Sequence, residues 1–432
     1  MRKLKNNLLL GLFTTSMIAL NSCKKDYANP NGALEDEVFT SARGMTAVAV
    51  GLQRTYSYSR AGTVYNMVTA NGFVTNELRL LNAGNDPENR LNTGGTSVDP
   101  NNSILANIWA NASKIILDAN RVIAAAPSIP DKPYASGLIA FSSIYKALSL
   151  GSLAMYWDKV PDSIGFNVTF SDRIVGFNRA IAIIDNALAF IQQNPISSSF
   201  TSNIPAGTDI LNTLYALKAR YALFAGNNSL ALATANLVDL SKRSTMNFDA
   251  VSINPIFETA TSTNNVFQPV DSTFGLPIGQ RPSATDKRVQ FYTTINSTIA
   301  PRFRVGGFGA SASSPWPYYL PGEITLIKAE AYARMSDLPN ALIELNKVVT
   351  KQPANDAFGI GSGELVPFAG ATQAAILDEI YRQRCIELFM SGLKLEDMRR
   401  FGRPLSERKR NFFPYPFRER DNNTNTPPDP PF

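Results

Sequence analysis

The chain has 432 residues, of which 44% are hydrophobic and 18% are charged, so it holds enough apolar material for a large packed core and is not a disordered segment. It contains no histidine, which excludes serine–histidine and cysteine–histidine catalytic pairs and nearly every common zinc or iron site. The net charge of +6 counts Arg2, Lys3 and Lys5, which lie in a segment that we expect to be removed, so the charge does not indicate nucleic-acid binding.

The amino-terminal residues have the pattern of a lipoprotein signal peptide. Three basic residues precede an uncharged, mostly apolar run at residues 8–20, which as a helix would reach roughly 20 Å and is too short for a bilayer core of about 30 Å. The run ends in Leu20-Asn21-Ser22-Cys23, with an aliphatic residue three before the cysteine and a small residue directly before it. We therefore predict that residues 1–22 are cleaved and that Cys23 carries fatty acyl chains such as palmitate; an ordinary exported cysteine is the alternative.

The next segments predict a tether, a helix and a loop-rich stretch. Residues 23–40 are polar and include Pro30 and Gly32, which favours an irregular tether. A first helix is expected near residues 41–58. Residues 61–102 contain many glycines and asparagines, so we expect loops and short strands there rather than helix.

Helical periodicity dominates from residue 103 onward. Apolar residues recur at three- and four-residue spacing, and the spacing predicts helices over residues 103–126, 134–157, 179–192, 210–225 and 230–240. Proline or glycine follows several of these segments, and the breaks are short. Short breaks between amphipathic helices indicate antiparallel hairpins.

An internal repeat supports this interpretation. Residues 218–236 (KARYALFAGNNSLALATAN) align without gaps to residues 328–346 (KAEAYARMSDLPNALIELN), and Gly226 aligns with Ser336 at the expected turn. Small residues at the turn and at the crossing points are typical of tetratricopeptide hairpins, in which two helices approach closely.

The remaining segments complete an all-α fold of tetratricopeptide-like hairpins with irregular loop excursions. Residues 245–319 are rich in Ser, Thr, Asn, Gly and Pro, and we expect them to form an excursion on the helical frame. Residues 372–400 predict one long helix, and residues 412–432 predict an extended, proline-rich tail. After the tether we distinguish an amino-terminal helical region at 41–250 and a carboxy-terminal region at 251–432.

Several strings, in this order, resemble the SusD/RagB family of outer-membrane lipoproteins. They are Cys23, residues 27–57 (YANPNGALEDEVFTSARGMTAVAVGLQRTYS), residues 145–161 (YKALSLGSLAMYWDKVP), Thr285-Asp286-Lys287-Arg288, residues 323–334 (EITLIKAEAYAR), residues 376–402 (ILDEIYRQRCIELFMSGLKLEDMRRFG) and residues 412–423 (FFPYPFRERDNN). The resemblance implies a SusD-like nutrient-binding protein that is anchored in the outer membrane by its lipid and faces the cell exterior. It also implies a TonB-dependent (SusC-like) transporter as partner, and a glycan as ligand, with peptides second.

Two groups of residues are candidates for ligand binding. Trp316, Tyr318 and Tyr319 lie in a proline-stiffened loop, and their flat rings suit the faces of sugars or of peptide side chains; the alternative is that they close the base of the following hairpin. Asn76, Glu77 and Arg79 fall in a segment that resembles a ligand-proximal loop of the family, and amide and charged groups suit hydroxyl-rich ligands; a solvated loop is the alternative.

Other conspicuous residues are interpreted as structural. Trp109 and Trp157 lie on predicted helices and are expected in the core, and Cys385 is expected to be a buried free thiol. Arg384 and Glu387 are one helical turn apart and are expected to form an ion pair, either locally or between helices. The basic residues between 399 and 410 are expected on a solvated face because acidic residues accompany them.

We expect neither a catalytic residue nor a cofactor nor a metal ion, because histidine, metal-ligand clusters and nucleophile motifs are missing from the sequence. Two other functions stay open at this point. One is a lipid-anchored glycoside hydrolase that uses two carboxylates, and the other is a helical-repeat adaptor without a small ligand.

Overall fold

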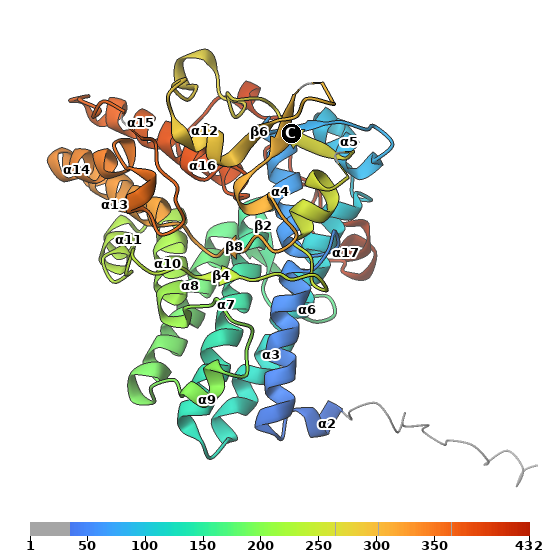
Figure 1. Cartoon of the computed structure of the whole chain (residues 1–432). Helices are drawn as coiled ribbons and strands as arrows, with labels where there is room; N and C mark the ends of the chain where they lie inside the picture. The colour runs from blue at the N-terminus through green and yellow to red at the C-terminus, as the bar shows by residue number, and fades with distance from the viewer. Residues whose placement is uncertain (1–34, 264, 301, 364) are drawn as a thin grey trace, which may run out of the picture.

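The computed structural model describes residues 35–432 apart from residues 264, 301 and 364 (Figure 1). The predicted signal peptide, Cys23 and most of the predicted tether therefore lie outside the described residues. The described chain begins with the short helix α2 (Glu35–Val38).

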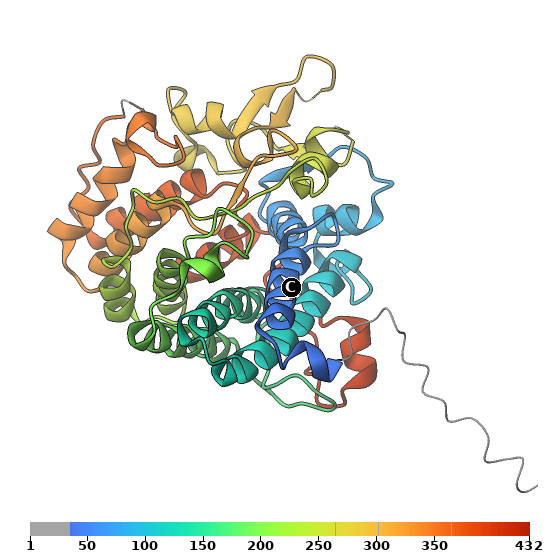
Figure 2. The ribbon, with the colours of Figure 1, turned by 60° about the horizontal axis from the view of Figure 1, so that its bottom comes forward.

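Long helices form the frame of the molecule. They are α3 (Ala42–Ser57), α6 (Ser103–Ala125), α7 (Lys132–Tyr156), α8 (Arg173–Gln193) and α10 (Ile210–Phe224). α7 packs against both α6 and α8, and α10 packs against α8 (Figures 1 and 2). These bounds confirm the helices predicted from periodicity, although α8 begins earlier than the prediction.

Each frame helix begins after a residue whose side chain accepts a hydrogen bond from a backbone N–H in the first turn. This N-cap satisfies one of the donors that a helix start leaves without a partner. The capping residues are Ser41, Asn102, Asp131, Asp172 and Asp209.

α7 is the central helix, and small residues let its neighbours approach closely. A Cβ atom on Gly137 would lie 2.1 Å from the Phe200 ring, and one on Gly151 would lie 2.3 Å from the Tyr221 ring.

Two of the described helices, α7 and α8, have the length and apolar composition of a membrane span; the most apolar stretch of α7 is 94% buried in the protein, and that of α8 is 33% buried.

The internal repeat corresponds to two stacked hairpins. α10 and α11 (Asn228–Ala235) form the first, and α13 (Pro321–Arg334) and α14 (Leu338–Val349) form the second, with α13 packed on α11. The aligned turn residues Gly226 and Ser336 both have a left-handed backbone, with φ of 80° and 66°. This local agreement confirms the hairpins predicted from the repeat.

The stretch predicted as loops at residues 61–102 contains a helix instead. α4 (Thr63–Val74) is buried along its whole length, α5 (Asp86–Thr93) is a second helix, and only β1 (Leu78–Leu80) is a short strand of the expected kind. The prediction was wrong because a helix buried on all sides has no polar face. Its asparagine amide groups donate within the protein: Asn66 donates to the carbonyl of Gly62 at 2.7 Å, and Asn71 donates to Glu77 at 2.6 Å.

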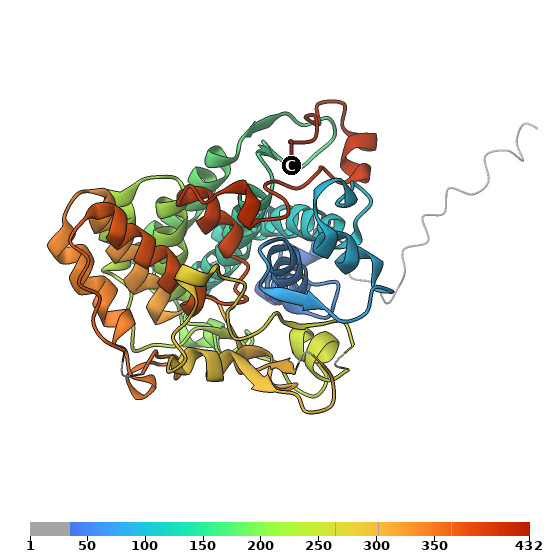
Figure 3. The same ribbon diagram turned by 90° about the horizontal axis from the view of Figure 1, so that it is seen from above.

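The excursion at residues 245–319 is irregular, as predicted, and is fastened by short antiparallel strand pairs. Seen from above, it lies along the edge that joins α4 to the carboxy-terminal hairpins (Figure 3). β1 pairs with β5, β6 with β7 and β4 with β8, while β2 and β3 form a hairpin between α7 and α8. The elements involved are β2 (Lys159–Pro161), β3 (Phe170–Asp172), β4 (Thr245–Met246), β5 (Phe267–Pro269), α12 (Lys287–Tyr292), β6 (Thr293–Ile295), β7 (Phe303–Val305) and β8 (Trp316–Pro317).

The helix predicted at residues 372–400 is divided in two. α15 (Gln373–Glu387) and α16 (Lys394–Arg400) are separated by a turn in which Met390 and Gly392 have φ of 63° and 83°. Periodicity misses the turn because its first residues, Leu388, Phe389 and Met390, are as apolar and buried as those of a helix.

The predicted extended tail is docked on the frame and contains α17 (Phe417–Asn422). The indole N–H of Trp157 donates to the carbonyl of Pro414 at 3.0 Å, and that of Trp109 donates to Glu419 at 3.0 Å. Both tryptophans are buried, as predicted, and their rings lie 4.9 Å apart. The remaining short elements are α9 (Ser198–Thr201), the π-turn Phe257–Thr261 and 3-10 turns at Gly95–Ser97, Ala126–Ser128, Ile278–Gln280, Gly307–Gly309, Pro353–Asn355 and Leu405–Glu407.

Buried charges of the carboxy-terminal region bear on two of the predictions. Arg384 pairs with Asp397 at 2.9 Å, and Glu387 pairs with Arg288 at 3.1 Å, so both residues form ion pairs between helices, the second of the two expected arrangements, and not a local pair with each other. Arg399 and Arg400 expose only 8% and 10% of their side chains, so the solvated face predicted for this cluster is wrong there. Cys385 is a buried free thiol, as predicted, and burial raises its pKa to about 12.

Candidate functional site

The loop that carries Trp316, Tyr318 and Tyr319 includes β8, and the pairing of β8 with β4 fixes the position of this loop on the frame. Met246 of β4 is the register partner of Trp316, and the backbone N–H of Tyr318 donates to the carbonyl of Ser244 at 3.1 Å. Trp316 keeps part of its surface exposed, whereas Tyr318 and Tyr319 expose only 4% and 1%. The three rings therefore differ in access to solvent, and Trp316 is the one that can meet a ligand without rearrangement.

Tyr318 anchors the loop to α7. Its hydroxyl shares a very short hydrogen bond with the Tyr145 hydroxyl and lies 3.2 Å from the Thr208 hydroxyl. Burial raises the pKa of Tyr318 to about 12, so the phenol stays neutral at physiological pH. It acts as a fixed support for its neighbours in the loop.

A buried ion pair holds the same loop from the other side. Arg220 of α10 donates to both carboxylate oxygens of Glu323 in α13, at 2.6 and 2.7 Å, and to the carbonyl of Tyr318 at 2.8 Å. Burial alone would lower the pKa of Arg220, but the adjacent Glu323 carboxylate outweighs it and raises that pKa. A bidentate pair with further hydrogen bonds is the arrangement in which a buried charge is tolerated, and here it sets the geometry of the loop.

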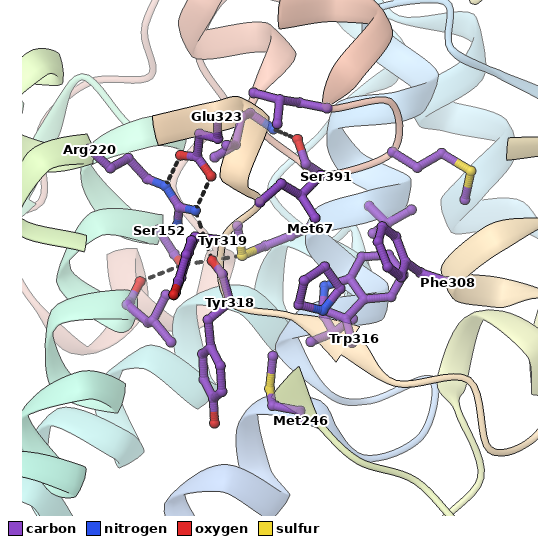
Figure 4. A pocket seen from close by; sticks show the side chains of 18 of the residues that line it. Met67, Ser152, Arg220, Met246, Phe308, Trp316, Tyr318, Tyr319, Glu323 and Ser391 are labelled. Carbon is purple, nitrogen blue, oxygen red and sulfur yellow. Dashed lines mark hydrogen bonds and ion pairs between the residues drawn. The ribbon is translucent and has the colours of Figure 1, made fainter. Parts of the chain in front are cut away.

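These groups surround a cavity of about 70 Å³. Trp316 and Phe308 lie beside each other, with ring centroids 6.3 Å apart, and the Arg220–Glu323 pair faces them across the cavity (Figure 4). Methionines fill much of the wall, and the Met67 sulfur accepts hydrogen bonds from Tyr56 and Ser152 at 3.4 and 3.3 Å. The cavity has room for a few water molecules only, so a larger ligand must lie across its mouth at Trp316.

The predicted polar residues lie elsewhere. Asn76, with φ of 63°, donates to the carbonyl of Glu407 at 3.2 Å and lines a different cavity. Glu77 is 1% exposed and accepts hydrogen bonds from Asn71 and Thr75, while Arg79 points outward from β1. The structure thus brings Trp316, Tyr318 and Tyr319 together and does not bring the other three to them.

The same architecture occurs in solved structures of SusD-like proteins. No protein-family model matches the sequence, and no curated protein matches it either. A SusD superfamily protein from Bacteroides vulgatus superimposes with a TM-score of 0.69 at 15% identity, covering 90% of this chain and 99% of that one. One from Bacteroides thetaiotaomicron gives 0.68 at 14% identity, covering 90% and 100%. A SusD-like carbohydrate-binding protein from Bacteroides fragilis gives 0.64 at 13% identity, covering 84% and 87%.

The chain has the SusD-like fold. The fold implied by the sequence resemblance is thereby confirmed. Within this SusD-like fold, sequence reasoning missed the Arg220–Glu323 pair, which connects the two stacked hairpins. One signal was present: both residues lie on apolar helices, at positions where a charged side chain faces the core and needs a partner.

The described part of the SusD-like chain holds no group of three or more Cys, Asp or Glu side chains suited to a metal ion. The groups around the Trp316 cavity are apolar, neutral or paired, and they are suited to contact a neutral ligand with a flat apolar face.

Proposed function

We propose that this SusD-like protein binds glycans at the outer face of a bacterial outer membrane and passes them to a TonB-dependent transporter. The observation that carries the glycan part is the partly exposed Trp316 at the mouth of a rigid aromatic cavity. Structural neighbours described as SusD-like carbohydrate-binding proteins support it.

Stacking on Trp316 is the expected mode of binding. A sugar ring has one face rich in C–H groups, and covering an indole with that face removes apolar surface from water. The indole is held in place by its strand pairing with Met246 and by Phe308, so little conformational entropy is lost on binding. Tyr318 and Tyr319 take part in the proposed platform from below, as the support that fixes the indole.

Replacing Trp316 tests the proposal. Trp316→Ala is expected to weaken binding of the recognised glycan by about 1–3 kcal/mol, measured by calorimetry after a glycan panel has identified it. Phe166→Ala is the matched control, because Phe166 is an aromatic residue that is 83% exposed on the β2–β3 loop, outside the cavity. Equal affinities of the wild type and Trp316→Ala would contradict the assignment, and binding of peptides with no glycan bound would favour the second ligand class.

The membrane anchor belongs to the same proposal. Acyl chains on Cys23 contribute roughly 0.8 kcal/mol for each buried methylene, so several chains give durable attachment. Cys23→Ala should release the protein from the membrane fraction or block its maturation. Unchanged fractionation, together with an unmodified amino terminus in the wild type, would contradict the anchor.

Transport requires a partner, and we propose a TonB-dependent barrel that this protein covers as a lid. Tethering both proteins to one membrane makes their encounter effectively intramolecular, so modest affinity is sufficient. Mild solubilisation should co-purify a barrel protein of about twice the size of this chain. Recovery of the lipoprotein alone in several mild detergents, with normal uptake in a deletion strain, would contradict the lid.

Binding without catalysis is the last element of the proposal. The tyrosines that line the cavity, such as Tyr318, have raised pKa values, and its carboxylate Glu323 is held in a bidentate ion pair. Purified protein should release no products from the glycan it binds. Hydrolysis that one Asp or Glu substitution abolishes would instead favour the hydrolase alternative.

A further inference from the structure

A second cavity of about 310 Å³ lies where the end of α4, the loop at residues 273–281, α15, α16 and the turn Leu405–Glu407 meet. It shares no lining residue with the Trp316 cavity. The groups that matter for its chemistry are Asn76, Thr273, Arg281, Tyr381, Lys394 and Glu407.

Lys394 is the unusual member of this wall. It is 4% exposed, and its ammonium donates to the carbonyl of Phe274 at 3.0 Å, but no carboxylate lies within ion-pair distance of it among the described residues. Another well-buried lysine, Lys351, has two such partners, Asp356 at 2.7 Å and the closer Glu387. The nearest opposite charge is Glu77, which interacts with the Lys394 ammonium through space without a direct ion pair.

The acidic groups near Lys394 are engaged with other partners. Glu77 accepts hydrogen bonds from Asn71 at 2.6 Å and from Thr75 at 3.2 Å. Asp397 lies 2.9 Å from both Arg384 and Arg400.

Glu407, on the cavity wall, pairs with Arg403 through both carboxylate oxygens, at 3.0 and 2.7 Å. Lys394 therefore brings a positive charge to the cavity wall without a direct ion pair, and the buried Glu77 carboxylate balances part of that charge through space.

Arg281 adds a second positive group at the rim. It is exposed, and its Nε makes one long hydrogen bond of 3.4 Å to the carbonyl of Leu276, which leaves the other guanidinium N–H groups without a partner among the described residues. A planar guanidinium and an ammonium together suit a carboxylate, because the fork binds two oxygens and the ammonium balances the charge.

The rest of the wall is preformed and partly apolar. The Tyr381 ring lines it, held between Phe401 at 5.5 Å and the Arg403 guanidinium at 5.0 Å from its centroid. Asn76 fixes the α4–β1 turn to the Leu405–Glu407 turn through its bond to the Glu407 carbonyl. The volume suits one compact ring, and Tyr381, which is 1% exposed, only bounds that volume.

We propose that this cavity binds a carboxylate-bearing ligand of monosaccharide size, with the carboxylate between Lys394 and Arg281 and the ring in the remaining volume. If the protein binds glycans, this ligand is a uronic acid, either free or as one unit of a glycan. The identification as a uronic acid rests on the proposed function, whereas the carboxylate site does not.

The test measures binding of sodium glucuronate, glucose and cyclohexanecarboxylate to the purified full chain by calorimetry at low ionic strength. Glucuronate should bind at least about tenfold more tightly than glucose, since a hydrogen bond to a charged group is worth more than one between neutral groups. Arg281→Gln should weaken glucuronate binding about tenfold, and Lys394→Met should weaken it at least as much. Arg302→Gln, at an exposed arginine in the β6–β7 turn, is the matched control and should have no effect.

Each outcome bears on the site itself. Arg281 is exposed, so its variant gives a result even if Lys394→Met does not fold. If glucuronate or cyclohexanecarboxylate binds to the wild type and to Trp316→Ala but not to Arg281→Gln, the result supports the carboxylate site. It does so even if no glycan binds at Trp316. Equal affinities for glucuronate and glucose, or glucuronate binding that is unchanged in Arg281→Gln, would overturn it.

Discussion

The amino-terminal frame and the carboxy-terminal hairpins are both buried helical structures, yet different interactions hold them. α7 is surrounded by apolar neighbours, and close approach at Gly137 and Gly151 sets its position. In the carboxy-terminal region, buried and nearly buried charges connect α12, α13, α15 and α16: Arg288 donates to Asp286 at 2.8 Å and to Glu387 at 3.1 Å, and Arg400 donates to Glu330 at 2.7 Å. Shape fixes the first region, and directed ion pairs fix the second.

The difference follows from the elements that are joined. Long adjacent helices bury wide apolar stripes, and ridge-and-groove packing is enough to orient them. The carboxy-terminal region joins helices and turns from distant parts of the chain, and charged side chains lie among the apolar residues of its core. A buried ion pair adds little net stability but tolerates only one geometry, and its loss leaves a charge without a partner. We therefore expect the two regions to respond to different kinds of substitution.

The largest effect is expected at Arg288. Arg288→Ala leaves the buried Asp286 without its guanidinium and Glu387 with Lys351 as its remaining ion-pair partner, and it should lower the free energy of unfolding by about 3–5 kcal/mol. Chemical denaturation measures this. Lys114→Ala is the control: its partner Asp118 lies on the surface of α6, and a loss below about 1 kcal/mol is expected. Similar losses in both variants would refute the directed role of the buried pairs.

The second effect depends on pH and should come from Glu330. Burial alone would raise the pKa of this carboxyl, but Arg400, Arg384 and Arg334 outweigh it and lower the pKa from 4.5 to about 2. As pH falls, Glu330 binds a proton in the unfolded chain before it does so in the folded protein. The stability that its ion pairs contribute is therefore complete above about pH 4.5 and is lost as pH falls towards about 2. It amounts to about 3 kcal/mol.

Urea unfolding of the wild type and of Glu330→Gln tests that expectation. The difference in stability between the two should be largest near neutral pH and should shrink as pH falls through this window. A difference that stays constant down to pH values near 2 would show that Glu330 is not the carboxylate that the arginines stabilise.

The third effect probes the frame. Gly151→Ala places a methyl group 2.3 Å from the Tyr221 ring, and overpacking should cost about 1–3 kcal/mol. Gly51→Ala, in α3, is the matched control because nothing lies within 4 Å of the added atom, and it should gain up to about 1 kcal/mol from helix propensity. A gain at both positions would mean that close approach does not set the position of α7.

The same contrast explains how much of the fold the sequence could predict. The frame helices were predicted because apolar periodicity is a local signal. Their capping residues, such as Asp131 and Asp209, are local signals too, although the prediction did not use them. α4 was missed because burial on all sides removes the periodicity, and the break between α15 and α16 was missed because its turn is apolar. The partners of Arg384 and Glu387 depend on tertiary packing, which one helix does not encode.

For the candidate site, the sequence could indicate residue types but not their directions. A proline-stiffened loop with three aromatic rings was visible, and the structure places all three around one cavity. The packing of α4 and β1 determines that the Glu77 side chain is buried and that Asn76 lines a different cavity. The second cavity joins residues more than 300 positions apart, such as Asn76 and Glu407, and no local pattern indicates it.

The smallest effect is expected from the loss of a helix N-cap, and it should be equal in the two regions. Asp131 caps α7 and Asp337 caps α14, each by accepting a hydrogen bond from a backbone N–H three residues later, at 3.0 and 3.3 Å. Asp131→Ala and Asp337→Ala should each cost about 1 kcal/mol in denaturation experiments, because a cap acts on its own helix whatever the core beside it contains. If the Asp337 cap costs several times more, the buried charges of the carboxy-terminal region depend on the start of α14, and the contrast between the regions extends to the helix ends.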